Sequence, residues 1–127
     1  MKIYISHSKK YDFKNELYLP IRNSILNTQH EFILPHEKSD LPFNSRDFIP
    51  TCNLVIAEVT YPGTGIGIEL GWADAAGVPI VCFYKQGIEP AGSLSVVSEN
   101  IIEYNSTDDL IEKIRIQLEK FVKENGL

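Results

Sequence analysis

Short apolar segments alternate with helical segments along the whole chain, and this alternation constrains the fold more than any other feature. A repeated strand-helix-strand order favours a parallel sheet, because each crossover helix packs back onto a face of the sheet. We therefore predict an α/β fold, a Rossmann-like or flavodoxin-like three-layer sandwich around a five-stranded parallel sheet. The predicted strands are residues 2–6, 31–34, 54–57, 79–84 and 100–104.

Start and stop signals of helices lie between these strands. Pro20 suits a first helical turn, Asn44 followed by Asp47 suits the start of a short helix, and Gly77 suits a helix end. In the fourth predicted helix, Ile68 and Trp72 fall at helical spacing with Ala75 or Ala76. The predicted helices cover about residues 20–26, 44–50, 65–77, 94–97 and 106–125. The last is amphipathic, so we expect it to pack on the sheet.

Length and composition narrow the class of protein. The 127 residues, 43% hydrophobic and 23% charged, are typical of a globular chain, and we expect a single domain over residues 1–127. A net charge of −5 without a basic cluster argues against a nucleic-acid polymer or an anionic membrane as partner, and favours a small ligand. Cys52 and Cys82 lack a CxxC partner, and we expect reduced thiols and a cytoplasmic location.

One segment combines features that suit chemistry. Glu58 ends a buried strand, a glycine-rich turn follows, and Glu69 lies near the start of the next helix between Gly67 and Gly71. The glycines remove side-chain bulk, so a ring or sugar can approach Glu69 closely. An acidic residue near a helix N-terminus is also stabilised by about 0.3–1 kcal/mol without any ligand. The pattern alone leaves both roles open, and it does not match the dinucleotide fingerprint GxGxxG.

Residues 57–73, which include Gly65-Ile66-Gly67-Ile68-Glu69-Leu70-Gly71, resemble the signature of the nucleoside 2-deoxyribosyltransferase superfamily. The resemblance is strongest to its 2'-deoxynucleoside 5'-monophosphate N-hydrolase branch and extends over most of the chain. In that family the glutamate attacks the anomeric carbon and forms a glycosyl-enzyme intermediate. The resemblance therefore implies that Glu69 is the nucleophile and that no cofactor is required. An anion there suits the oxocarbenium-like transition state.

The resemblance implies two further catalytic residues. Arg46-Asp47 resembles an arginine-aspartate pair of the family, so Asp47 is the candidate acid that protonates the departing base. Helix capping is an equal alternative for Asp47, which lies 22 residues before Glu69, two fewer than in the hydrolase branch. Tyr4 matches a first-strand tyrosine whose hydroxyl orients the nucleophile, although such a tyrosine can also be a simple core residue.

The loop after the first strand is the implied phosphate site. Ser8 and Lys10 occupy the places of a serine and an arginine in the hydrolase's phosphate loop, which Ser6 and His7 begin. His7 and His36 have no metal-ligand spacing to a cysteine or carboxylate, so we expect surface positions or ligand contacts and no metal site.

The glycine turn and a later serine complete the predicted substrate site. Gly63, Gly65 and Gly67 form the turn, and Gly63 stands where the hydrolase branch has serine and the transferase branch has aspartate. Ser95, or alternatively Ser93, matches a residue that reaches the neighbouring subunit's site, which implies a homodimer.

Three functions follow from these expectations. The first is an N-glycosidase of nucleoside 5'-monophosphates, with 2'-deoxynucleotides expected. The second is a transferase that exchanges bases between deoxynucleosides. The third is a nucleotide-binding or sensor domain without catalysis, which the glycine at position 63 favours.

Overall fold

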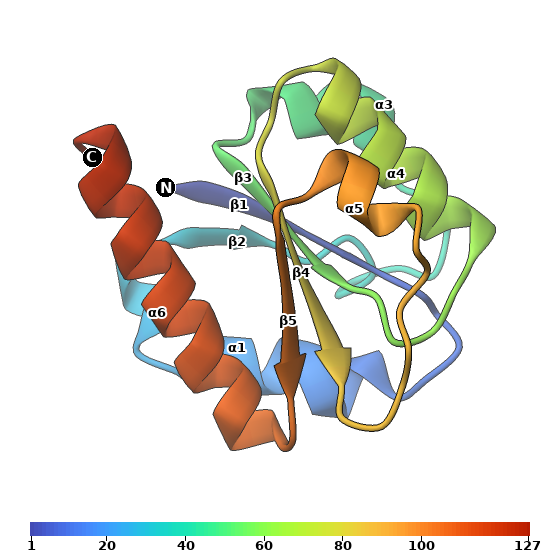
Figure 1. The fold of residues 1–127 in the computed structure, drawn as a ribbon, viewed down its shortest axis with the longest axis horizontal. Helices are drawn as coiled ribbons and strands as arrows, with labels where there is room; N and C mark the ends of the chain where they lie inside the picture. Colours follow the sequence, from blue (N-terminus) through green and yellow to red (C-terminus); the bar gives the residue numbers. More distant parts are fainter.

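The computed structural model describes residues 1–127 and has a central sheet of five parallel strands (Figure 1). The strands are β1 (Lys2–His7), β2 (Glu31–Ile33), β3 (Leu54–Glu58), β4 (Ile80–Lys85) and β5 (Asn100–Tyr104). Their order in the sheet is β2-β1-β3-β4-β5, as in flavodoxin-like doubly wound folds. The predicted α/β class, strand number and parallel pairing are confirmed.

Helices cover both faces of the sheet. They are α1 (Leu19–Arg22), α2 (Leu26–Gln29), α3 (Ser45–Phe48), α4 (Thr64–Ala75), α5 (Leu94–Val97) and α6 (Thr107–Asn125). In Figure 1, α1 and α6 lie on one face, and α3, α4 and α5 lie on the other. None of the helices combines the length and apolar character that a bilayer span requires.

One predicted helix differs from the observed structure. The segment at residues 20–26 belongs to a broken run made of a π-helical turn (Lys14–Tyr18), α1 and α2. Pro20 lies in the first turn of α1 as predicted, but the helix ends at Arg22. The Ser24 hydroxyl donates to the Ile21 carbonyl at 2.7 Å and so competes for a backbone acceptor. The other predicted elements agree to within one or two residues.

The alternation of side chains along β1 divides the core into two layers. Ile3 and Ile5 pack in the layer under α1 and α6, whereas Tyr4 packs in the layer under α4. Because successive side chains of a strand point to opposite faces, Ser6 shares the α4 side with Tyr4. Two hydroxyl groups are thereby directed toward the helix that carries Glu69.

The terminal helix α6 is held at both ends and along its apolar stripe. Ser106 caps its start by accepting the backbone N–H of Asp109 at 3.1 Å, and Gly126 ends it with a φ of +65°. Leu110, Ile114 and Leu118 are buried against the sheet, which confirms the predicted packing.

We expect Ile114→Ala to lower the free energy of unfolding by about 2–4 kcal/mol, because Ile114 is fully buried in the core and truncation leaves a cavity. Ile116→Ala is the matched control, since Ile116 lies on the same helix and is 46% exposed. Urea unfolding followed by circular dichroism measures both. Equal losses in the two variants would contradict the observed orientation of α6.

Candidate active site

A cavity of about 380 Å³ opens at the carboxyl ends of β1 and β3, beside the point where the strand order reverses. Ligands of doubly wound sheets bind at this position. Its walls come from the loop after β1, from the segment around α3 and from the first turns of α4. Glu69 lies in the second turn of α4 and contributes its carboxylate to this cavity.

Two hydroxyl groups of β1 hold the Glu69 carboxylate. Tyr4 Oη donates to Glu69 Oε2 at 2.5 Å, and Ser6 Oγ donates to Glu69 Oε1 at 2.8 Å. Burial raises the pKa of Tyr4, and the neighbouring Glu69 charge and hydrogen bond raise it further, so the phenol keeps its proton and remains a donor. Tyr4 is therefore both a core residue and a partner of Glu69. No ion pair involves Glu69.

Ser8 and Lys10 both line the cavity next to Glu69, as does Lys9 between them. Ser8 is buried, and its Oγ accepts the backbone N–H of Lys10 at 3.1 Å. Lys9 donates through Nζ to the Asp40 carbonyl at 2.8 Å. The side chain of Lys10 forms no hydrogen bond, since only its backbone N–H donates. The structure thus brings the predicted phosphate loop and Glu69 to one cavity.

Gly63 and Gly65 line the same cavity, whereas Gly67 faces a different one. Gly63 precedes the first residue of α4 with a φ of −166°, an extended conformation open to any residue. A Cβ at position 63 would lie 3.6 Å from Ser8 Oγ and 3.9 Å from Ile66, which are ordinary contacts. Neither backbone nor space therefore requires glycine at position 63.

His7 lines the cavity but is buried, so a surface position for it is wrong. Its Nε2 lies 2.5 Å from Tyr18 Oη, and Tyr18 Oη accepts the backbone N–H of His36. The Ser8 carbonyl can only accept, so His7 Nδ1–H donates to it at 2.9 Å, and in the neutral ring Nε2 accepts from the Tyr18 phenol. Burial lowers the pKa of His7 to about 4, consistent with a neutral ring. His36 also lines the cavity, and its buried Nδ1 has no partner.

Asp47 lies outside the cavity, at the exposed surface of α3. Its carboxylate accepts from Asn44 Nδ2 at 2.9 Å, and Arg46 Nε is 3.4 Å away. The hydrogen bond from Asn44 and the charge of Arg46 lower the pKa of Asp47, which holds it ionised. The start of α3 is capped by Asn44, whose Oδ1 accepts the backbone N–H of Asp47 at 3.4 Å. Ser45, two residues earlier and buried, is the residue of α3 that lines the cavity.

Ser93 and Ser95 do not reach the Glu69 cavity of their own chain. Ser95 Oγ donates to the Gly92 carbonyl at 2.9 Å. Ser93 lines a separate cavity of about 360 Å³, which shares Gly63 and Ile66 with the first. No group of three or more His, Cys, Asp and Glu side chains is arranged to hold a metal ion.

No family model matches the chain. A Syntrophotalea carbinolica protein provisionally named 2'-deoxynucleoside 5'-phosphate N-hydrolase 1 is 33% identical over 78 residues, which cover 58% of this chain and 55% of that protein. The 5-hydroxymethyl-dUMP N-hydrolase of Rattus norvegicus is 44% identical over 39 residues, or 31% of this chain and 24% of the relative. The chain thus spans about half the length of the first relative and less of the second.

Two solved structures match nearly the whole chain. A CMP N-glycosidase of Clostridium botulinum superposes with a TM-score of 0.66 at 24% identity, covering 91% of this chain and 99% of that one. A conserved protein from Enterococcus faecalis superposes with a TM-score of 0.62 at 20% identity, covering 92% of this chain and 98% of that one. The chain shares the fold of these two structures. The resemblance to the nucleoside 2-deoxyribosyltransferase superfamily and to its N-hydrolase branch, expected from the sequence, is confirmed.

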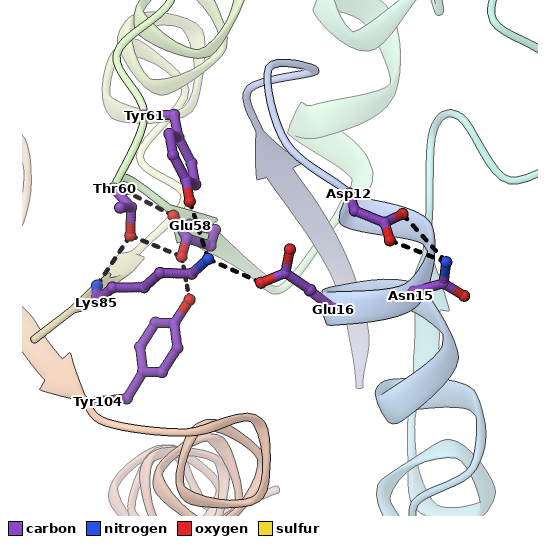
Figure 2. Close-up of polar contacts among 8 residues, drawn as sticks. All are labelled: Asp12, Asn15, Glu16, Glu58, Thr60, Tyr61, Lys85 and Tyr104. Carbon is purple, nitrogen blue, oxygen red and sulfur yellow. Dashed lines mark hydrogen bonds and ion pairs between the residues drawn. The ribbon is translucent and has the colours of Figure 1, made fainter.

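Glu58 ends β3 just before the glycine turn and is only 2% exposed. Its carboxylate accepts from Thr60 N at 2.7 Å, from Thr60 Oγ at 2.8 Å and from the Tyr104 hydroxyl (Figure 2). Thr60 Oγ in turn accepts the backbone N–H of Lys85 at 2.9 Å. Glu58 and Thr60 therefore connect the glycine turn to β5 and β4. The Glu58 carboxylate is occupied by these donors, so a contact with a sugar or base is not supported.

The loop after β1 is joined to the glycine turn by aromatic stacking. The rings of Tyr11 and Tyr61 stack with centroids 4.8 Å apart. Lys85 Nζ donates to Tyr61 Oη at 2.9 Å and to Glu16 at 2.8 Å, and Figure 2 shows it between these two residues. The loop after β1 and the glycine turn are thus joined by contacts among Tyr11, Tyr61 and Lys85.

The apolar wall of the cavity was missed from the sequence. Phe43, Ile68 and Trp72 line the cavity and remain partly exposed. The helical spacing of Ile68 and Trp72 correctly indicates a helix, but the buried residues of α4 are Ile66, Leu70 and Ala73. Since α4 is apolar on most sides, its periodicity does not single out one face. In the sequence, only the proximity of Ile68 and Trp72 to Glu69 on the same helix could have indicated that they line the cavity.

We expect stability to fall more steeply with acidification in the wild type than in His7→Gln. The folded pKa of His7, about 4, lies below its ordinary value of 6.5, so the unfolded chain binds the proton first. The neutral His7 ring contributes roughly 3 kcal/mol to the free energy of unfolding. This contribution is complete above pH 6.5 and is lost as the pH falls to about 4. Urea unfolding at pH 7 and pH 4 measures the difference. His30→Gln is the control and should lose as much unfolding free energy between pH 7 and pH 4 as the wild type. An identical loss in His7→Gln would contradict a lowered pKa for His7.

Proposed function

We propose that the chain is an N-glycosidase that cleaves the base-sugar bond of nucleoside 5'-monophosphates, 2'-deoxynucleotides among them, with Glu69 as nucleophile. The observation that carries this proposal is the half-buried Glu69 carboxylate, held by Tyr4 and Ser6 in a cavity at the carboxyl edge of the sheet. The names of the relatives support it, since they describe nucleotide N-hydrolases and a CMP N-glycosidase.

The reaction proceeds in two displacements. A Glu69 oxygen attacks the anomeric carbon C1', the C1'–N bond breaks, and its electron pair leaves with the base, which takes up one proton. Water then attacks C1', the C1'–O bond to Glu69 breaks, and the water proton passes to the conjugate base of the acid. The products are free base and sugar 5-phosphate. A cavity of about 380 Å³ lies in the usual range for small-ligand sites.

The 5'-phosphate is proposed to lie between the loop after β1 and the start of α4. Ser8 and Lys10 supply a hydroxyl and a cation, and Gly63 gives no side-chain cap to the helix. The backbone N–H groups of the first turn of α4, a helix of 12 residues, are therefore available to an anion. This end of the cavity suits a phosphate group.

The acid that protonates the departing base has two candidates. Asp47, suggested by the family resemblance, is exposed, outside the cavity and held ionised by Asn44 and Arg46. His36 lines the cavity with a buried and unpartnered Nδ1 and is the better placed group within one chain, but burial and the charge of Lys9 lower its pKa, so the protonated ring must form when the substrate binds.

A homodimer is part of the proposal. Ser93 and Ser95 do not reach the Glu69 cavity of their own chain, so their family role requires a second copy. Val96 on α5 and Ile68 on α4 are exposed apolar side chains that such a contact would cover. A cytoplasmic location stays a prediction, supported by the free thiols of Cys52 and Cys82.

Base release from a panel of nucleosides and nucleotides tests the function. We expect wild type to release free base from monophosphates in plain buffer and Glu69→Gln to be slower by more than about 1000-fold, because the nucleophile is removed. Glu99→Gln, at an exposed glutamate outside the cavity, is the matched control and should retain full activity.

Two other outcomes of the panel distinguish the alternatives. Products that form only when a free acceptor base is supplied indicate the transferase. Binding without base release from any substrate, with wild type equal to Glu69→Gln, indicates a nucleotide sensor and overturns the catalytic proposal.

Loss of the proposed phosphate contacts should lower activity on monophosphates and leave activity on nucleosides nearly unchanged. We expect Ser8→Ala and Lys10→Ala each to lower kcat/KM for monophosphates by about tenfold, since each removes one contact to a charged oxygen. Rates with nucleosides should change little, and Lys38→Ala, an exposed lysine outside the cavity, serves as control. Equal losses on both substrate types would refute the phosphate assignment.

A further inference from the structure

Ser6 is a fully buried serine in a strand of apolar residues, and its hydroxyl has one hydrogen-bond partner, Glu69 Oε1 at 2.8 Å. Burying a hydroxyl is costly unless it is hydrogen-bonded. Its neighbour across the sheet is Ala57 of β3, which offers no polar side chain. The hydroxyl of Ser6 is therefore satisfied by the proposed nucleophile alone.

The contacts of Ser6 and Tyr4 fix the orientation of the carboxylate. Each donor binds a different oxygen of Glu69, so rotation about the last side-chain bond would break both hydrogen bonds. That torsion is broad in glutamate, and a single donor leaves the carboxylate plane poorly defined. Both donors are neutral hydroxyl groups, so neither forms an ion pair with the carboxylate.

The two donors differ in their freedom to move. The ring of Tyr4 is fully buried in the core layer under α4, which fixes its hydroxyl. Ser6 is also fully buried, but its oxygen is on a short side chain that can change rotamer without moving a ring, and Ser6 lies two residues closer to the carboxyl edge of β1, where the cavity opens. The oxygen held by Ser6 is therefore the one that can be released toward a ligand.

Glycosyl transfer changes the two carboxylate oxygens unequally. The oxygen that bonds to C1' becomes an ester oxygen and a poor hydrogen-bond acceptor, whereas the other becomes a carbonyl and remains a good acceptor. A fixed donor suits the carbonyl oxygen, and a rotating donor suits the oxygen that reacts. Tyr4 and Ser6 match these two requirements.

We propose that Ser6 is a positioning residue that holds Oε1 of Glu69 as the attacking oxygen, while Tyr4 retains Oε2 throughout the reaction. This inference rests on the proposed glycosidase function. In the first step the C1'–Oε1 bond forms as the C1'–N bond breaks, and the Ser6 hydrogen bond weakens as Oε1 becomes an ester oxygen. When water displaces the sugar, the C1'–Oε1 bond breaks and the Ser6 hydrogen bond to the restored carboxylate regains its strength.

The test compares wild type with Ser6→Ala in the full chain, using a monophosphate that the wild type cleaves. We expect kcat to fall roughly 10-fold to 100-fold with KM unchanged, since the lost hydrogen bond is to a charged group. The acidic limb of the pH-rate profile should shift to higher pH, because the carboxylate accepts one donor fewer. Ser6→Thr restores a hydroxyl and should recover most of the rate.

Binding can be measured separately from turnover, because Trp72 is the one tryptophan of the chain and lines the cavity. We expect the same monophosphate to change Trp72 emission with equal affinity in Glu69→Gln and in the Ser6→Ala, Glu69→Gln double variant. Ser98→Ala is the matched control, since Ser98 is a buried serine bonded to the Ile80 carbonyl away from the site. It should alter stability without altering kcat.

Two results would overturn the assignment of Ser6 while leaving the glycosidase function intact. One is a Ser6→Ala variant with the kcat and pH-rate profile of wild type. The other is a raised KM with unchanged kcat, which would make Ser6 a substrate contact. If wild type and Glu69→Gln do not differ on any substrate, the proposed function itself fails, and the role of Ser6 fails with it.

Discussion

The contact between β1 and Glu69 is the interaction on which the site depends. Tyr4 and Ser6 share one face of a central strand, and α4 crosses that face with its carboxylate above both hydroxyls. This arrangement requires β1 and β3 to pair in parallel, so that the turn after β3 carries α4 back over β1. The cavity, the loop after β1 and the start of α4 all take their positions from this crossing.

The fold could be predicted from the sequence because its signals are local. Apolar runs, glycine and proline punctuation and the stripe of α6 depend on neighbouring residues, and their predicted bounds hold within a few positions. The break between α1 and α2 escaped prediction because it depends on one hydroxyl, that of Ser24, competing for a backbone carbonyl.

The site was predictable only where a family signature marked it. Glu69 and the loop around Ser8 meet at one cavity as expected, and the contact between Tyr4 and Glu69, which joins residues 65 positions apart and has no local signal, was expected from the family resemblance alone. The outward direction of Asp47 and the burial of His7 depend on how separate elements pack. Two similar glutamates also have different surroundings: Glu58 is enclosed by donors from β5 and its own turn, whereas Glu69 faces the cavity.

The extended backbone and free space at Gly63 bear on how such a site changes during evolution. A Cβ added at position 63 would meet Ser8 and Ile66 only at van der Waals distance, so a side chain can begin there without displacing the sheet or α4. Gly63 also lies where two cavities meet, so a side chain there alters the shape and charge of both. Under the proposed function, a substitution at this single position would change substrate preference with little cost in stability, and separate lineages would reach different preferences on the same scaffold.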